Sequence, residues 1–137
     1  MTGIDLIIII WLLFFVSSCS DKENRPDCST IIRNGKFEYR GGFSNKQFTI
    51  ERDDSIQIEK DTDTGFGMKF KIEWDDECDY ELTLISFIIA GKDSLIKQSE
   101  FAPVKTEVLK VTKNYYVCRS AMQGENAIRR DTMLIVK

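Results

Sequence analysis

The stretch that decides the fold is Met68-Lys-Phe-Lys-Ile-Glu-Trp-Asp-Asp-Glu-Cys-Asp-Tyr-Glu-Leu-Thr-Leu84. Apolar and polar residues alternate in its first half, and the alternation resumes after a short acidic turn. Successive side chains of a β-strand point to opposite faces, so each half has one face for a core and one for water. The pattern predicts an antiparallel hairpin. Its expected inner face consists of Met68, Phe70, Ile72, Trp74, Cys78, Tyr80, Leu82 and Leu84.

Similar alternation on both sides of this hairpin predicts further strands at 36–40, 47–51, 55–59, 106–118 and 130–136. Segment 106–118 reads as one long strand or as a tight hairpin, and 91–103 as a helical turn or as a strand with a loop. The tail 85–90 is apolar on both faces, which predicts a strand covered from two sides. The expected inward side chains of the flanking strands are Phe37, Tyr39, Phe48, Ile50, Ile56, Ile58, Leu109, Val111, Tyr115 and Val117.

About seven short strands with few helical patterns indicate an all-β fold, an antiparallel meander. We expect a closed or half-open, lipocalin-like barrel, because closure removes the edges that such a sheet exposes. An N-terminal signal helix is expected to precede it.

The composition narrows the classes of function. The 137 residues suit one domain, and a net charge of −3 with interleaved signs leaves no basic stripe for nucleic acid. The chain has no histidine, which removes the commonest general base, the Ser-His and Cys-His pairs and most catalytic zinc sites. We therefore expect a protein that is not an enzyme.

The N-terminal residues have the features of a targeting signal. The apolar run 6–16 is too short to cross a bilayer core of about 30 Å and is typical of a secretory signal peptide. The following Val16-Ser-Ser-Cys19 resembles the lipobox of bacterial lipoproteins, which implies a diacylglyceryl group on Cys19 and cleavage after Ser18. The alternative is an uncleaved helix with a chance thiol, since the residues before the run contain Asp5 but no Lys or Arg.

These features divide the chain into a signal peptide (1–18), a lipidated tether (19–27) and an antiparallel β domain (28–137). The expected partner is a membrane, reached through two or three acyl chains at Cys19. The charged residues 20–24 resemble a surface-export signal and also suit a plain solvated linker. We expect an outer-membrane location with its face undecided.

Three cysteines remain once Cys19 is lipidated, and an exported protein is free to form disulfides. A Cys28–Cys78 bond is favoured because it would join the start of the domain to the central hairpin. Cys118 is then left over as a small core residue.

Other motifs are weaker. Asp61-Thr-Asp63-Thr-Gly65 begins like a calcium-binding EF-hand loop, but the glycine comes one position early and Ile72 stands where the bidentate glutamate belongs. The acidic groups 53–54 and 75–77 contain carboxylate pairs of the kind hydrolases use, and acidic turns are the simpler interpretation. Gly65-Phe-Gly67 lacks the third glycine of a dinucleotide loop. No metal and no cofactor is expected.

The chain also reads Cys28…Gly35-Lys-Phe37, then Glu51-Arg52…Gln57-Ile-Glu59, then Trp74…Cys78-Asp-Tyr80-Glu-Leu82. This spacing resembles a family of small Bacteroidetes-type envelope proteins over 28–84. The resemblance implies location and fold but no activity. Some members carry a topoisomerase label, which the secretion signal and the missing basic groove do not support.

The polar residues of that pattern allow two interpretations. Arg52 and Glu59 either pair on the surface of a hairpin, or join Gln57 in a polar cluster inside the barrel, where unpaired burial would be costly. The aromatic side chains of Trp74, Tyr80 and 115–116 belong to the core or line a pocket.

Three functions follow from these expectations. The first is a lipid-anchored binding or structural module of the envelope, with an envelope protein as partner. The second is a lipocalin-like carrier of a small apolar ligand, and a distant third is a carboxylate-dependent hydrolase.

Overall fold

The computed structural model describes residues 28–41, 45–97 and 100–137. The expected signal peptide, the lipidation site at Cys19 and the tether 19–27 lie outside them. The elements in chain order are α2 (Cys28–Ile31), β1 (Gly35–Arg40), β2 (Gln47–Arg52), β3 (Ile56–Asp61), β4 (Gly67–Trp74), β5 (Tyr80–Ile89), β6 (Lys92–Leu95), β7 (Val104–Val111), β8 (Tyr115–Met122) and β9 (Ile128–Val136).

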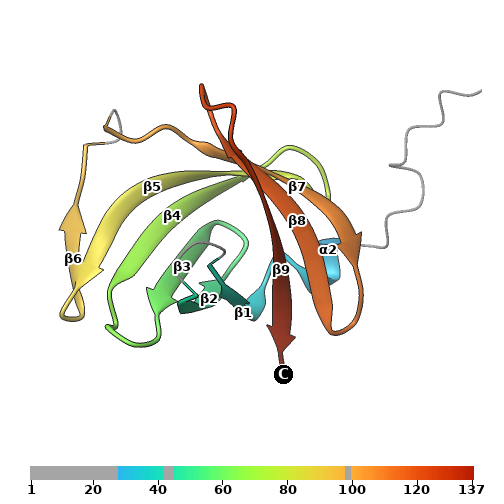
Figure 1. Cartoon of the computed structure of the whole chain (residues 1–137), viewed down its shortest axis with the longest axis horizontal. Helices are drawn as coiled ribbons and strands as arrows, with labels where there is room; N and C mark the ends of the chain where they lie inside the picture. Colours follow the sequence, from blue (N-terminus) through green and yellow to red (C-terminus); the bar gives the residue numbers. More distant parts are fainter. Residues whose placement is uncertain (1–27, 42–44, 98–99) are drawn as a thin grey trace, which may run out of the picture.

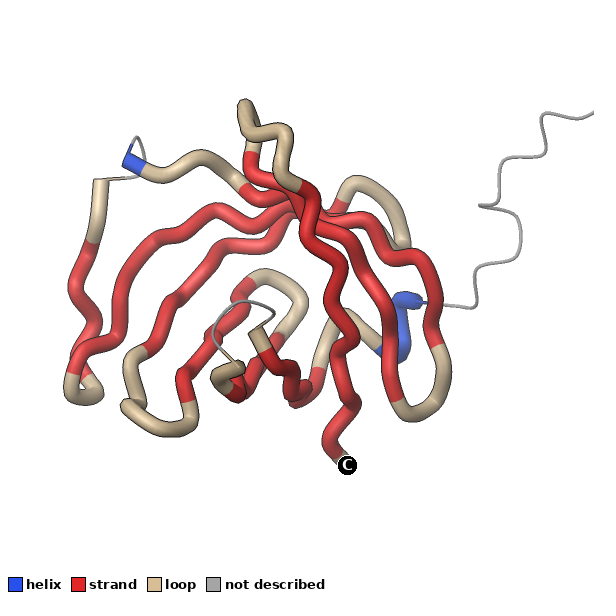
Figure 2. The backbone as a smooth tube through the Cα atoms, in the orientation of Figure 1, coloured by secondary structure: helices blue, strands red, loops and turns tan. Residues whose placement is uncertain are grey.

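The strands form one antiparallel sheet in the order β4-β3-β2-β1-β9-β8-β7-β5-β6, and β4 also pairs with β5. That last pairing closes eight strands into a barrel and leaves β6 on the edge of β5, outside the ring. Figures 1 and 2 show the strands curling around a common interior, with β6 projecting at one side. The expected antiparallel, all-β barrel is confirmed.

The central hairpin matches its prediction. Strands β4 and β5 pair from Trp74↔Tyr80 to Gly67↔Ile88, with a bulge between Lys69 and Phe70. Most of the expected inner face is buried, whereas Met68 and Trp74 are half-buried. The tail of β5 is not covered on both sides as expected, because Ile89 is 56% exposed.

Strand β3 has the opposite face inward from the one expected. Gln57, Glu59 and Asp61 are buried, while Ile56 and Ile58 are only half-buried. Pairing with β2 explains the reversal, because it places Gln57 opposite Arg52 and Glu59 opposite the fully buried Ile50. Residues that pair across strands share a face, so Gln57 and Glu59 point into the barrel.

The segment 106–118 is a hairpin, and its inner face also differs from the expected one. A register shift between Val108 and Lys110 turns Leu109 outward, where it is 36% exposed. Tyr116 and Cys118 are completely buried on β8, where Tyr115 was expected to face inward and is half-buried. A bulge inserts one residue into the strand, which shifts the alternation by one position. Of the undecided segment 91–103, the described part contains the short strand β6.

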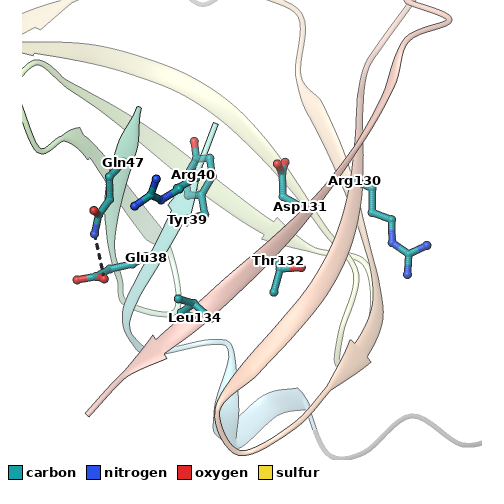
Figure 3. A pocket seen from close by; sticks show the side chains of 8 residues that line it. All are labelled: Glu38, Tyr39, Arg40, Gln47, Arg130, Asp131, Thr132 and Leu134. Atoms are coloured by element: carbon teal, nitrogen blue, oxygen red, sulfur yellow. Dashed lines mark hydrogen bonds between the residues drawn. The ribbon is translucent and has the colours of Figure 1, made fainter. Parts of the chain in front are cut away.

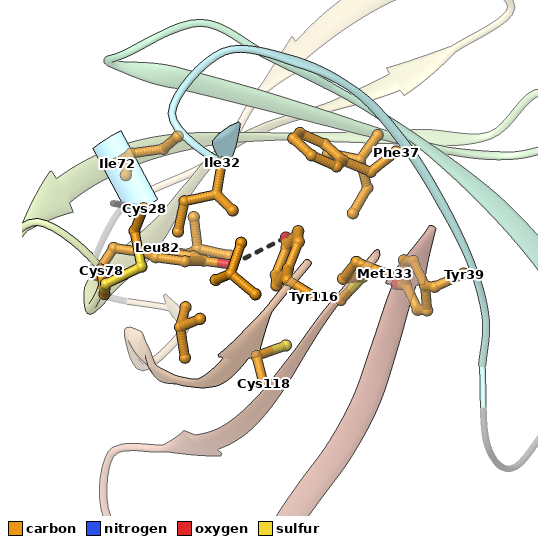
Figure 4. Packing of buried hydrophobic residues seen from close by; sticks show 14 of the residues in the cluster. Cys28, Ile32, Phe37, Tyr39, Ile72, Cys78, Leu82, Tyr116, Cys118 and Met133 are labelled. Carbon is orange, nitrogen blue, oxygen red and sulfur yellow. Dashed lines mark hydrogen bonds between the residues drawn. A yellow bond between two sulfur atoms is a disulfide. The ribbon is translucent and has the colours of Figure 1, made fainter. Parts of the chain in front are cut away.

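One end of the barrel is closed by α2. Cys28, at the start of this helix, forms a disulfide with Cys78 just before β5, which confirms the expected bond (Figure 4). Ile32 follows the helix and is completely buried among Phe37 and Tyr116. The bond therefore holds the first described segment against the barrel end.

The Cys28–Cys78 bond closes a loop with a sequence separation of 50, for which the chain-entropy relation gives about 4 kcal/mol of stabilisation. We expect the double variant Cys28→Ser/Cys78→Ser to lose most of this free energy of unfolding, as measured by urea denaturation. Dithiothreitol is expected to lower the midpoint of the unsubstituted domain and not that of the double variant. An equal response of both proteins to the reductant would contradict a stabilising role for this bond.

Candidate functional site

A cavity of about 560 Å³ lies in the barrel at the end away from α2, and it opens to solvent beside the loop between β8 and β9. Its wall is mainly apolar, with polar side chains from β1, β3, β5, β7, β8 and β9 and from the loop between the last two strands. Residues lining it are Tyr39, Gln57, Glu59, Met68, Phe70, Tyr80, Leu82, Val104, Thr106, Ser120, Ala121, Met122, Glu125, Ala127, Ile128, Arg129, Arg130 and Met133.

The topology explains why the cavity exists. Strand β5 pairs with β7 only from Tyr80 to Leu82, and its later residues pair with β6 instead. Strands β5 and β7 therefore separate above Leu82, so the ring is wide at this end. The opposite end is filled by large buried side chains, among them Ile32, Phe37 and Tyr116.

The floor of the cavity rests on Arg52, which is 5% exposed. Its Nε and Nη2 donate to Gln57 Oε1 at 2.8 and 2.5 Å, and Nη1 donates to the carbonyl oxygen of Ile32 at 2.7 Å. Nη2 also donates to the hydroxyl oxygens of Tyr80 and Tyr116, at 3.1 and 3.0 Å. The guanidinium thus joins β2, β3, β5, β8 and the segment after α2.

Aromatic rings surround the same guanidinium. Its central carbon lies 4.7 Å from the ring centroid of Tyr80 and 5.1 Å from that of Phe37. A cation near the face of an aromatic ring is attracted by the ring's quadrupole, more strongly when water is excluded. These contacts partly replace the hydration that Arg52 loses on burial.

The polar cluster continues from Gln57 to Glu59. Gln57 Nε2 donates to Glu59 Oε1 at 2.7 Å, and the hydroxyl of Tyr39 donates to Glu59 Oε2 at 2.9 Å. Because Gln57 Oε1 accepts from the guanidinium, its amide nitrogen must face Glu59. The interior cluster that the sequence allowed is present, with Gln57 placed between the two charges.

Burial and charge act in opposite directions on Glu59. Desolvation raises the pKa of its carboxyl, while the bonds from Tyr39 and Gln57 and the charges of Arg129 and Arg52 lower it, with a net rise. Burial lowers the pKa of Arg52, but Tyr116 and Tyr80 outweigh this and the pKa is raised. Desolvation raises the pKa values of Tyr39, Tyr80 and Tyr116, so these phenols stay neutral at pH 7.

The acidic residues that the sequence suggested for calcium binding or hydrolysis include two, Asp61 and Asp53, that stabilise turns. Asp61 Oδ1 accepts from the backbone N–H of Asp63 at 2.9 Å, and this bond and the Lys46 side chain lower the pKa of Asp61. Asp53 Oδ1 accepts from the N–H groups of Ser55 and Ile56, which lower the pKa of Asp53. The acidic stretch 61–65 is therefore the turn between β3 and β4.

Arg33 brings the two acidic groups 53–54 and 75–77 together at the α2 end. It donates to the carboxylate of Asp54 at 3.2 Å and to the carbonyl oxygen of Asp76 at 3.1 Å, and lies 4.5 Å from the Trp74 ring centroid. Neither acidic group lines the barrel cavity. In the described part of the chain, no three acidic or cysteine side chains gather as a metal site.

The remaining described cysteine, Cys118, is not a candidate for a reactive thiol. Cys118 is completely buried, and desolvation raises the pKa of its thiol to about 12. Because the thiolate is the reactive form of cysteine, this thiol is inert at neutral pH.

A second hollow of about 440 Å³ lies on the outer wall, where β1 and β9 meet (Figure 3). These strands pair only from Lys36↔Val136 to Glu38↔Leu134 and diverge beyond. Most of the residues that line it are of polar types, and its Gln47 and Glu38 side chains are hydrogen-bonded to each other at 3.2 Å. It offers less apolar wall than the barrel cavity, which is the stronger candidate.

Only some of the residues suggested by the sequence line the cavity. Of the suggested pocket aromatics, Tyr80 lines the cavity, whereas Trp74 packs on Tyr80 with ring centroids 4.9 Å apart. Several lining residues gave no signal in the sequence, because they come from β7, β8, β9 and the loop between the last two. The residues missed include Thr106, Ser120, Met122, Ile128, Arg129 and Met133.

Replacing Arg52 with Met should lower the free energy of unfolding by about 3–5 kcal/mol, because Glu59 would remain buried without its compensating charge. The matched control is Arg119→Met, which removes a half-exposed arginine paired with Glu107 and should cost less than about 1 kcal/mol. Urea denaturation of both variants gives the comparison. Equal, small losses would show that the buried cluster does not stabilise the fold.

Among the described residues, no helix has the length and apolar character needed to span a membrane. Comparisons of the chain with models of protein families, with curated proteins and with solved structures gave no match.

Proposed function

We propose that this protein is a non-enzymatic, lipid-anchored envelope module whose β-barrel binds a small, mainly apolar ligand. The observation that carries the proposal is the solvent-open cavity of about 560 Å³ in the wide end of the barrel. Ligand sites in proteins have volumes of about 300–1,000 Å³, mostly apolar walls and a few polar groups that orient the ligand. The cavity has all three properties.

The arrangement of its wall supports a carrier over a purely structural module. Phe70 and Leu82 form an apolar surface below the mouth, and Met122 and Met133 face them from β8 and β9. Methionine side chains are flexible and polarisable, so they adapt to ligands of different shape. A structural module would have no need for an apolar interior that is open to solvent.

The lipid anchor is part of the proposal. A diacylglyceryl group on Cys19 would hold the barrel at the outer membrane by the short tether 19–27, in keeping with the resemblance to envelope lipoproteins. Membrane lipids and their breakdown products would then be close to the cavity. The hydrolase alternative loses support because both acidic groups lie outside the cavity, where Asp53 and Asp76 accept hydrogen bonds from backbone N–H groups of their own turns.

A Trp placed in the wall of the mouth should block binding. Val104 pairs with the inward-facing Leu82 and lines the cavity, so we expect Val104→Trp to weaken binding of the neutral, apolar dye Nile red at least about tenfold. The neighbouring Lys105 is exposed, and Lys105→Trp should leave binding unchanged. Fluorescence titration of the soluble domain 28–137 measures both, and equal affinities for the two variants would place the dye outside the barrel.

The anchor has its own test. Expression of the full chain with radiolabelled palmitate should label the protein, and Cys19→Ala should lose the label and leave the membrane fraction. Cys118→Ala serves as the control, since a buried thiol is not acylated. Intact mass showing a bare Cys19 with the leader still attached would refute the anchor without affecting the barrel cavity.

A further inference from the structure

The charges inside the barrel are balanced before any ligand enters. The hydrogen-bond acceptors of Arg52 are all neutral: an amide oxygen, a carbonyl oxygen and two phenol oxygens. Its compensating negative charge is Glu59, on the far side of Gln57, and the two charges influence each other. Arg129, whose charge also acts on Glu59, pairs with the buried Asp131 at 2.5 Å. The positive charges of Arg52 and Arg129 are thus matched in number by Glu59 and Asp131, and the cavity lining adds one exposed charge of each sign, Arg130 and Glu125.

The carboxylate of Glu59 retains hydrogen-bonding capacity toward the cavity. Each of its oxygens accepts one bond from the described residues, one from Gln57 and one from Tyr39. An ionised carboxylate has about four acceptor positions on its two oxygens. Glu59 lines the cavity, so a ligand that reaches the floor meets an acceptor with positions to spare.

We propose that the floor of the cavity takes an uncharged hydrogen-bond donor, the hydroxyl or amide N–H of an otherwise apolar ligand, and rejects an ammonium or a carboxylate at that end. This inference rests on the proposed function and names its ligand class. Fatty alcohols, monoacylglycerols and fatty amides share this chemistry.

The rejection of charged groups follows from the balance between the charges of Arg52 and Glu59. A carboxylate at the floor would lie against Glu59 with Arg52 already compensated, and it would offer no donor. An ammonium would add a further positive charge at the floor, where the negative charge of Glu59 already compensates Arg52. An uncompensated ion in a protein interior costs several kcal/mol, whereas a hydroxyl adds no charge and forms a charge-assisted bond.

Three ligands of equal chain length test the inference: 1-decanol, decylamine and decanoate, each displacing Nile red from the soluble domain at pH 7.5. We expect 1-decanol to bind at least about tenfold more tightly than either charged compound. If Nile red binds and a charged compound equals or exceeds 1-decanol, the inference is wrong and the proposed function stands. If neither Nile red nor any of the three binds, both are wrong.

A single substitution should change the preference. Glu59→Gln keeps the shape of the side chain but leaves Arg52 without compensation, so decanoate should gain at least about tenfold relative to 1-decanol. The control, Glu51→Gln, makes the same change of charge at an exposed position of the neighbouring strand β2 and should leave the ranking unchanged. An unchanged ranking in a folded Glu59→Gln variant overturns the inference. If that variant does not fold, the ranking by the unsubstituted domain decides.

Discussion

A buried guanidinium constrains the whole of this barrel. Arg52 donates to groups on β3, β5, β8 and the segment after α2, so one side chain joins opposite walls of the ring. Arginine does not lose its proton in proteins, so its charge has to be compensated where it lies. The surrounding residues do this with neutral acceptors, aromatic faces and, through one amide, the carboxylate of Glu59.

The barrel has two different halves, one on each side of the buried network around Arg52. In the half closed by α2, the disulfide, Ile32 and the buried aromatic side chains of Phe37 and Tyr116 belong to one packed cluster (Figure 4). In the other half, β5 leaves β7 and the apolar wall is open to solvent. Glu59 and Tyr39 lie at the boundary, bonded to the network on one side and lining the cavity on the other. A fully hydrogen-bonded polar network of this kind rigidifies the floor of the cavity.

Much of this fold was predictable from the sequence, and the failures have specific physical causes. The alternation from Met68 to Leu84 identified the central hairpin, and the expectation of an exported chain with three cysteines besides Cys19 allowed the correct disulfide. In β3 the alternation separates isoleucines from polar residues but does not say which set faces inward. The answer depends on the pairing of Gln57 with Arg52, a polar partner on the next strand. In β7 a bulge shifts the alternation of inward and outward side chains, and no residue near it in the sequence predicts the bulge.

The candidate site was predictable only in part for a similar reason. Arg52, Gln57 and Glu59 suggested an interior cluster as one of two options. The three polar residues lie close together in the sequence, on one expected hairpin, so their proximity could be predicted. The cavity has none. It is formed where β5, β7, β8 and β9 come together, and its lining depends on where the ring closes and where two strands separate, which is a property of the topology.

The central claim is that Glu59 stays ionised in the barrel as the counter-charge of Arg52. A ¹³C NMR titration of the side-chain carboxyl of Glu59 in the soluble domain tests it most directly. The account predicts the chemical shift of a carboxylate at pH 7 and a protonation midpoint above the ordinary range of glutamate, because desolvation raises its pKa. A protonated Glu59 at pH 7 would contradict the charge-balanced floor and the ligand class inferred from it.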